Sequence, residues 1–183
     1  MSETSAVRRL YRVLDAVLRP LEIAAAVVGG IMIVSAMLLT AADVIFRYVF
    51  DWPLDFAYYF SENYLMVGMM TMPMAWGFRT GGYIRVIGLA RMLPSVPRDL
   101  LLRLGLMAGA VYLAMLGWLA WEKFLDAYMT SSVEMGVIDW PVCWSWIWIP
   151  IGCLVFSLRL LVMTIGPASE LHFDHVLVAE DVA

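Results

Sequence analysis

The chain has 183 residues, of which 63% are hydrophobic and only 15% are charged, and its formal net charge is -4. Soluble domains are closer to about half apolar and about a quarter charged, so this composition excludes an ordinary soluble domain and predicts an integral membrane protein. The sequence has no basic cluster of the kind that binds nucleic acid, which excludes that class of partner.

The first 20 residues predict an amphipathic helix, because apolar residues recur at helical spacing and mostly basic residues occupy the opposite face. The apolar positions are Val7, Leu10, Leu14, Val17, Leu18 and Leu21, and the polar positions are Arg8, Arg9, Arg12, Asp15 and Arg19. We expect residues 1–20 to form a cytoplasmic leader on an anionic membrane surface, with Pro20 marking the bend into the bilayer. A solvated leader is the alternative.

Four long apolar runs follow, at about 21–46, 54–78, 100–121 and 140–165. Each reaches or exceeds the roughly 20 residues that cross a bilayer as a helix. They predict an all-α membrane protein whose membrane domain, residues 21–165, has four transmembrane helices. Pro150 lies inside the fourth run beside Ile151 and Gly152 and is expected to kink that helix.

The segment between the second and third runs has apolar residues at helical spacing over about 83–93, before Pro94. This pattern predicts a second amphipathic helix, an interfacial arm along the membrane surface. An irregular loop is the alternative. Residues 166–183 are polar and acidic and are expected to form a cytoplasmic tail.

Basic residues are unequally divided between the two ends of the predicted spans. Of the 12 lysines and arginines, only Arg47 and Lys123 fall on one side in a four-span arrangement. Because positively charged loops stay in the cytoplasm, the distribution predicts that both termini and the arm at 83–93 are cytoplasmic.

Charges inside an apolar run are costly, so each requires an explanation. Asp43 and Arg47 are four residues apart near the outer end of the first span and can pair along the helix. They could instead contact another helix or subunit. Glu62, followed by Asn63, lies about two turns into the second span. Its carboxylate could couple transport to protons, pair with Arg47, or pair with a basic group of a partner chain.

No motif for enzymatic chemistry is present in the sequence, so we predict that the chain is not an enzyme. The spans lack a histidine that could hold haem iron. His172 and His175 in the tail have the spacing of a metal pair, but no other Cys or His lies near them, and no metal site is predicted. Cys143 and Cys153 are ten residues apart, about 15 Å along a helix, which is too far for a disulfide.

Three stretches of the sequence together match the pattern of a known family. The first is Phe46-Arg47-Tyr48-Val49-Phe50 with Trp52-Pro53 and Glu62, the second is Gly82-Tyr83-Ile84-Arg85-Val86 leading to Leu93-Pro94, and the third is Trp140 with Ile149-Pro150-Ile151-Gly152. Because these three stretches occur in this order, the chain resembles the small integral-membrane subunit, the DctQ type, of tripartite ATP-independent periplasmic (TRAP) transporters over roughly residues 20–165. It departs from the family pattern at Asn63, Tyr83 and Asp139, where a second acid, a histidine and a proline are usual.

The resemblance implies a non-catalytic scaffold subunit in the bacterial inner membrane. Its partners would be a large membrane subunit, a periplasmic binding protein and membrane lipids. The large subunit (M type) would bind substrate and sodium and move as an elevator. The binding protein (P type) would deliver an organic acid. No cofactor is expected in this chain. The candidate interface or structural residues are Asp43, Arg47, Trp52, Pro53, Glu62 and Asn63, and the candidate arm or lipid contacts are Arg79, Arg85 and Arg91.

Two other functions are compatible with four membrane spans. One is a self-contained small transporter that uses Glu62 for proton coupling. The other is the membrane anchor of a redox or signalling enzyme, for which the lack of histidine in the spans argues against a haem-binding version.

Overall fold

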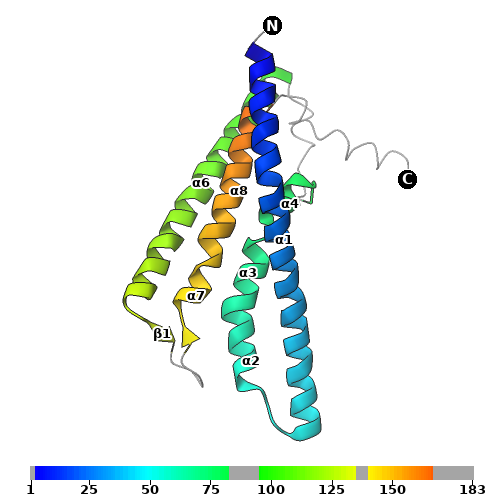
Figure 1. Cartoon of the computed structure of the whole chain (residues 1–183), viewed down its shortest axis with the longest axis vertical. Helices are drawn as coiled ribbons and strands as arrows, with labels where there is room; N and C mark the ends of the chain where they lie inside the picture. Colours follow the sequence, from blue (N-terminus) through cyan, green and yellow to red (C-terminus); the bar gives the residue numbers. More distant parts are fainter. Residues whose placement is uncertain (1–2, 83–94, 135–139, 167–183) are drawn as a thin grey trace, which may run out of the picture.

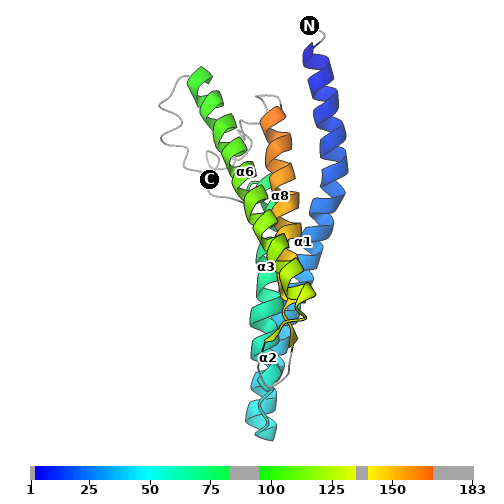
Figure 2. The ribbon, with the colours of Figure 1, turned by 90° about the vertical axis from the view of Figure 1, so that its left-hand side faces the viewer.

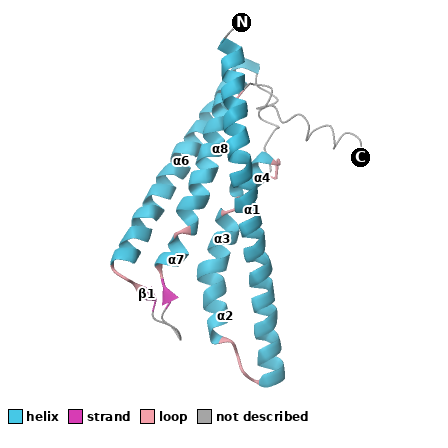
Figure 3. Cartoon of the chain, in the orientation of Figure 1, coloured by secondary structure: helices cyan, strands magenta, loops and turns pink. Residues whose placement is uncertain are grey.

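The computed structural model describes residues 3–82, 95–134 and 140–166. The described residues are almost entirely helical (Figure 3). The longest helices are α1 (Glu3–Phe50), α6 (Ser95–Met129) and α8 (Trp148–Ile165), and the shorter helical pieces are α2 (Asp55–Phe60), the π-helix η1 (Ser61–Leu65), α3 (Met66–Thr71), α4 (Met74–Arg79) and α7 (Cys143–Trp146). Two short strands, β1 (Val133–Glu134) and β2 (Trp140–Pro141), pair antiparallel with Val133 opposite Pro141.

The molecule is an elongated bundle in which α8 lies between two neighbours. Figure 1 shows α6 and α8 side by side, while the pieces from α2 to α4 run along the C-terminal half of α1. Figure 2, from the side, places α8 between α6 and the N-terminal part of α1. The main core lies where α4, α6 and α8 meet, and its buried residues are Ala75, Ala110, Phe156 and Leu160.

Three described helical segments are long and apolar enough to cross a membrane: Arg9–Phe50, Pro97–Met129 and Cys143–Ile165. They correspond to the first, third and fourth predicted spans, so the prediction of a helical membrane protein is confirmed. The second predicted span, 54–78, is not one continuous helix in the structure. The count of four spans therefore stays a prediction.

The second predicted span is interrupted at two places. Residues Ser61–Leu65 form a π-helix, in which the Met66 N–H donates to the carbonyl of Ser61. Further on, Met72 and Pro73 form a turn between α3 and α4. Proline has no N–H for the preceding turn, and its ring clashes with the carbonyl four residues back, that of Met69. The hydropathy of the run predicted its length but neither break.

The predicted bend at Pro20 is wrong, because α1 continues through this residue. The apolar side of the N-terminal part of α1 packs on α8, where Tyr11, Leu18 and Val162 form a second buried cluster. This packing supplies a tertiary reason for the helix to continue, although proline removes one of its hydrogen bonds. A separate leader that bends away at Pro20 is therefore not formed.

The predicted kink at Pro150 has a counterpart in the structure. The helix is interrupted at Ile147, between α7 and α8, and Pro150 lies in the first turn of α8. A helix would need the Pro150 N–H to bond the carbonyl of Trp146, and proline has none. The interruption is therefore found one turn before Pro150.

The interfacial arm predicted at 83–93, the metal-pair spacing of His172 and His175, and nearly all of the predicted tail at 166–183 lie outside the described residues. Cys143 and Cys153 are both free thiols, as predicted.

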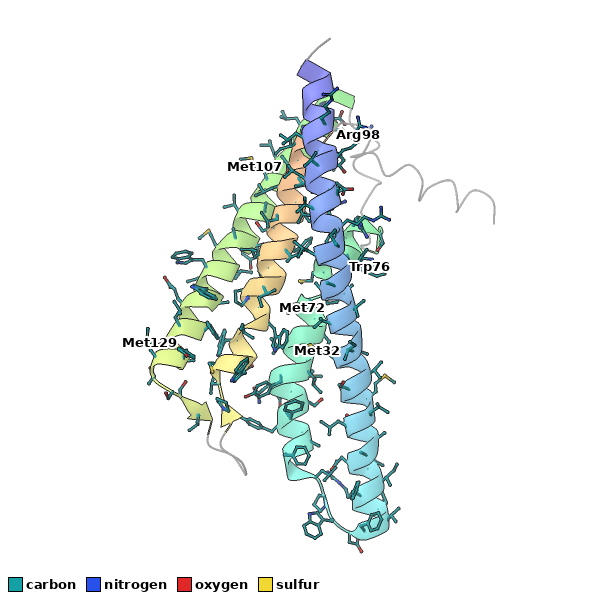
Figure 4. The ribbon with its side chains drawn as sticks, viewed as in Figure 1. Met32, Met72, Trp76, Arg98, Met107 and Met129 are labelled. Carbon is teal, nitrogen blue, oxygen red and sulfur yellow. The ribbon has the colours of Figure 1, made fainter. Side chains whose placement is uncertain are left out.

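Close backbone contacts hold the broken helix against its neighbours. A Cβ atom added to Gly152 would lie 2.5 Å from the carbonyl oxygen of Thr71, so α8 and α3 touch there. The hydroxyl of Thr71 also lies 3.3 Å from the carbonyl oxygen of Trp148, to which it donates. On the other side Met32 of α1 packs on Gly68, and Figure 4 shows Met32 and Met72 between α1 and the broken helix.

Candidate interaction surface and ionic cluster

The connection between α1 and α2 is held by Asp43. One oxygen of its carboxylate accepts a hydrogen bond from Arg47 at 2.9 Å, which confirms that this pair can form along the helix. The other oxygen accepts the backbone N–H of Leu54 at 2.8 Å. That N–H stands at the start of α2, where a helix cannot satisfy its own donors. Asp43 therefore fixes where α2 begins relative to α1.

Trp52 and Pro53 lie in this connection with exposed side chains, and Trp52 is 72% exposed. Asp51 turns the chain with a positive φ of 50°, and the Trp52 N–H donates to the carbonyl of Phe46 at 3.3 Å. The two side chains are available to lipid or to another protein at this end of the bundle.

The π-helix η1 gives Glu62 and Asn63 different surroundings. Asn63 lies toward α7, where its backbone carbonyl accepts the hydroxyl of Ser145. The neighbouring Tyr64 hydroxyl donates to the carbonyl of Pro141 at 2.7 Å. Asn63 therefore has a structural position in the bundle, while Glu62 is exposed on another side.

Glu62 lies in a groove of about 400 Å³ between α1 and the α2–η1 segment, which we call the hairpin groove. Its lining residues are Thr40, Asp43, Arg47, Ala57, Tyr58, Ser61, Glu62 and Met66. The Tyr58 hydroxyl hydrogen-bonds the Glu62 carboxylate. In the described part of the chain no basic side chain lies within 4.0 Å of that carboxylate, because Arg47 pairs with Asp43 instead. The groove thus contains one carboxylate that no basic group of the described chain neutralises.

A second group of charges, which we call the ionic cluster, joins α1, α4 and α8. Glu22 is 0% exposed and Arg159 is 3% exposed. The Nε atom of Arg79 lies 3.1 Å from Glu22 Oε2, and the Nε atom of Arg159 lies 3.5 Å from Glu22 Oε1. Arg159 also contacts Asp15, with 2.5 Å between Nη1 and Oδ1.

The ionic cluster is electrically balanced, because its two carboxylates, Asp15 and Glu22, face two guanidinium groups. Asp15 and Glu22 are seven residues apart, which places them on one face of α1. Neither oxygen of Glu22 makes a well-aligned hydrogen bond within the described residues. Glu22 is therefore held by charge attraction, which is strong in an environment without water.

Residues 36–169, well over half of the chain, match the family model for "Tripartite ATP-independent periplasmic transporters, DctQ component". The chain belongs to the DctQ family. It is thus a small membrane component of a TRAP transporter, in a family of transporter components rather than of enzymes. Searches of curated proteins and of solved structures each give no match.

DctQ membership confirms the resemblance inferred from the sequence. The hairpin groove and both arginines of the ionic cluster lie within the matched residues, while Asp15 and Glu22 precede them. The lipid contacts expected of Arg79 stay a prediction, although the structure pairs this residue with Glu22. Arg85 and Arg91 lie outside the described part of this DctQ chain.

Sequence reasoning did not identify Glu22 as a site residue. A usable signal existed, because Glu22 lies at the start of the first apolar run and Arg159 lies near the end of the last one, and that start and that end were expected on the same side of the membrane. Opposite charges at matching depths in two apolar helices are good candidates for a pair. The contact of Ser145 with Asn63 had no such signal, because it depends on the π-turn.

Proposed function

We propose that this DctQ component is a non-catalytic scaffold subunit of a TRAP-type secondary transporter. In this role it braces the static part of a large elevator-type membrane subunit. The complex takes up an organic acid with sodium, and a periplasmic binding protein delivers the substrate. Sodium is bound by the large subunit in this scheme.

One observation carries the proposal. In the described residues, the buried charges of the apolar helices join the helices of the chain to one another. Asp15, Glu22, Arg79 and Arg159 join three helices, and Asp43 joins α1 to the start of α2. A transport path needs polar groups that face a passage, whereas a brace needs internal rigidity and outer apolar faces. Figure 4 shows Met107 and Met129 on the outer side of α6, where they are 53% and 81% exposed.

Co-purification with the products of neighbouring genes tests the scaffold function. The tagged chain is expressed together with those genes and extracted in a mild detergent. We expect it to retain a much larger multi-span membrane protein in constant ratio. Recovery of the chain alone, under conditions in which the large protein is present in the extract, would contradict the proposal.

We also propose that the segment Asp55–Arg79 crosses the membrane despite its breaks, which completes four spans with both termini in the cytoplasm. The support is its contact with α1 along its length, together with the contacts of α3 and α4 with α8. Irregular backbone is tolerated at membrane depth where protein covers it, and here Ser145 and Thr71 make contacts at the breaks.

A self-contained proton-coupled transporter is the second candidate, and it is favoured by the exposed Glu62 carboxylate, which has no basic partner among the described residues. Reconstitution of the chain alone into liposomes separates the two functions. The second candidate requires proton-coupled flux that Glu62→Gln abolishes. The scaffold function predicts no flux from the wild-type chain alone.

A further inference from the structure

The hairpin groove has an excess of one negative charge. Asp43 and Arg47 neutralise each other at 2.9 Å, which leaves Glu62 as the third charged residue of the lining. Tyr58 donates one hydrogen bond to Glu62. A carboxylate has two oxygens that can accept about four hydrogen bonds, so most of its capacity is open to a donor from outside the described chain.

Water is expected to solvate the Glu62 carboxylate less well than a donor from a partner protein would, because of where Glu62 lies in the chain. It lies eight residues after Leu54, which is about 12 Å along a helix, within the second predicted span. The groove also contains apolar side chains, Ala57 and Met66. In a segment that crosses the membrane, an ionised carboxylate at this depth is costly unless another charge pairs with it.

The π-helix explains why the carboxylate is presented outward. A π-turn uses one residue more than an α-turn and so rotates the following residues around the helix axis. Asn63 and Tyr64 are thereby bonded to the segment of Pro141 and Ser145, while Glu62 stays in the groove beside α1. The described part of the fold thus fixes the direction of Glu62 without pairing its carboxylate with a basic side chain.

We propose that the hairpin groove receives a transmembrane helix of the large TRAP membrane subunit, and that Glu62 pairs there with an arginine or lysine side chain of that helix. This inference rests on the proposed scaffold function. Charge complementarity selects the occupant, because one positive charge on the partner helix would balance the unmatched carboxylate of Glu62 in the described groove. A buried pair of this kind sets the position of two helices along the membrane normal as well as their affinity.

The test uses the co-expressed pair of subunits and two variants, Glu62→Gln and Glu62→Lys. The matched control is Glu122→Gln, because Glu122 is also exposed and also accepts a hydrogen bond from an aromatic residue four positions earlier, Trp118, at 2.9 Å. We expect both Glu62 variants to weaken binding of the large subunit by about tenfold or more. The control variant should bind as the wild type does.

Two additional measurements make the result specific. The melting temperature of the Glu62→Gln chain alone should equal that of the wild type, because Glu62 has no basic partner in the described chain. Each arginine or lysine in the spans of the large subunit is also changed singly to glutamate. One of these changes should restore binding of the large subunit to the Glu62→Lys chain.

The outcomes separate this inference from the proposed function. A wild-type chain that never binds a large membrane subunit contradicts both. Normal binding by both Glu62 variants contradicts only the groove inference. The inference is also overturned if Glu62→Lys abolishes a homodimer instead, or if sodium ions alone stabilise the isolated chain through Glu62.

Discussion

Glu22 is completely buried and depends on two arginines for its charge balance. Burying a carboxylate without a partner is very unfavourable, and here the guanidinium groups of Arg79 and Arg159 approach it from α4 and α8. Because Arg159 is itself 3% exposed, removing Glu22 would leave a buried cation with Asp15 as its remaining partner. Glu22 therefore links three helices through its charge.

Glu22→Gln is expected to destabilise the chain strongly, because it keeps the shape of the side chain and removes its charge. Breaking a buried ion pair typically costs about 3–5 kcal/mol. Thermal unfolding in detergent measures the effect, with Glu122→Gln, at an exposed site, as the control that should change little. Combining Glu22→Gln with Arg159→Gln should cost less than the sum of the two single changes. An additive result would show that the two groups do not interact.

Arg103 of α6 holds the end of α8. Its guanidinium donates to the carbonyls of Thr164 at 2.7 Å and Gly166 at 3.0 Å. These carbonyls have no helical partner at the end of α8, where the helix dipole also favours a positive charge.

Arg103→Met should remove both hydrogen bonds and lower stability by about 1.5–3 kcal/mol. Arg103→Lys keeps the charge and should lose less. Equal melting temperatures for the wild type and Arg103→Met would contradict this role for the guanidinium.

At the scale of elements, the contact between α3 and α8 depends on the absence of a side chain at position 152. A Cβ there would lie 2.5 Å from the Thr71 carbonyl oxygen, while a Cβ at Gly105 of α6 would meet nothing within 4 Å. Both glycines are in helices that were predicted to span the membrane. They form a matched pair in which only the packing differs.

Gly152→Ala is expected to force α3 and α8 apart and to cost about 1–3 kcal/mol through overpacking. Gly105→Ala should be neutral or stabilise α6 by about 0.5–1 kcal/mol, because alanine favours a helix over glycine. Melting temperatures of the two variants in the same detergent provide the comparison. The same loss in both would mean that the effect comes from helix propensity and not from the contact.

The sequence allowed α1, α6 and α8 to be predicted because length and hydropathy are local properties of a segment. The Asp43–Arg47 pair was predictable for the same reason, since residues four positions apart in a helix have neighbouring side chains. The continuation of α1 through Pro20 and the π-turn at Ser61–Leu65 were not, because each depends on contacts with distant residues. The ionic cluster as a whole was missed because the sequence does not say which helices pack together, although the matching depths of Glu22 and Arg159 were a usable signal for that one pair.

For the whole molecule, the route of the chain through the membrane depends on the broken segment Asp55–Arg79. If this segment crosses, Trp52 and Thr130 lie on the periplasmic side and Thr80 lies in the cytoplasm. A segment that enters and returns would place Trp52 and Thr80 on the same side.

Single cysteines at these three positions distinguish the two routes, in a chain whose free Cys143 and Cys153 are replaced by serine. We expect a thiol reagent that does not cross membranes to label Trp52→Cys and Thr130→Cys in intact cells. Thr80→Cys should react only after permeabilisation. Labelling of Thr80→Cys together with Trp52→Cys in intact cells would contradict the four-span topology.

The uninterrupted α1 also determines how far its N-terminal part extends beyond the bilayer. From Glu22 to Phe50 the helix covers about 42 Å, close to the 40–45 Å of a bilayer with its headgroups. Placing Glu22 at one headgroup surface therefore places Phe50 at the other. The 19 residues of α1 before Glu22 then extend about 28 Å farther along the helix axis, supported as far as Tyr11 by its packing against Gly166. A fluorophore on the first turn of α1 would stand beyond the reach of quenchers carried by the lipid headgroups.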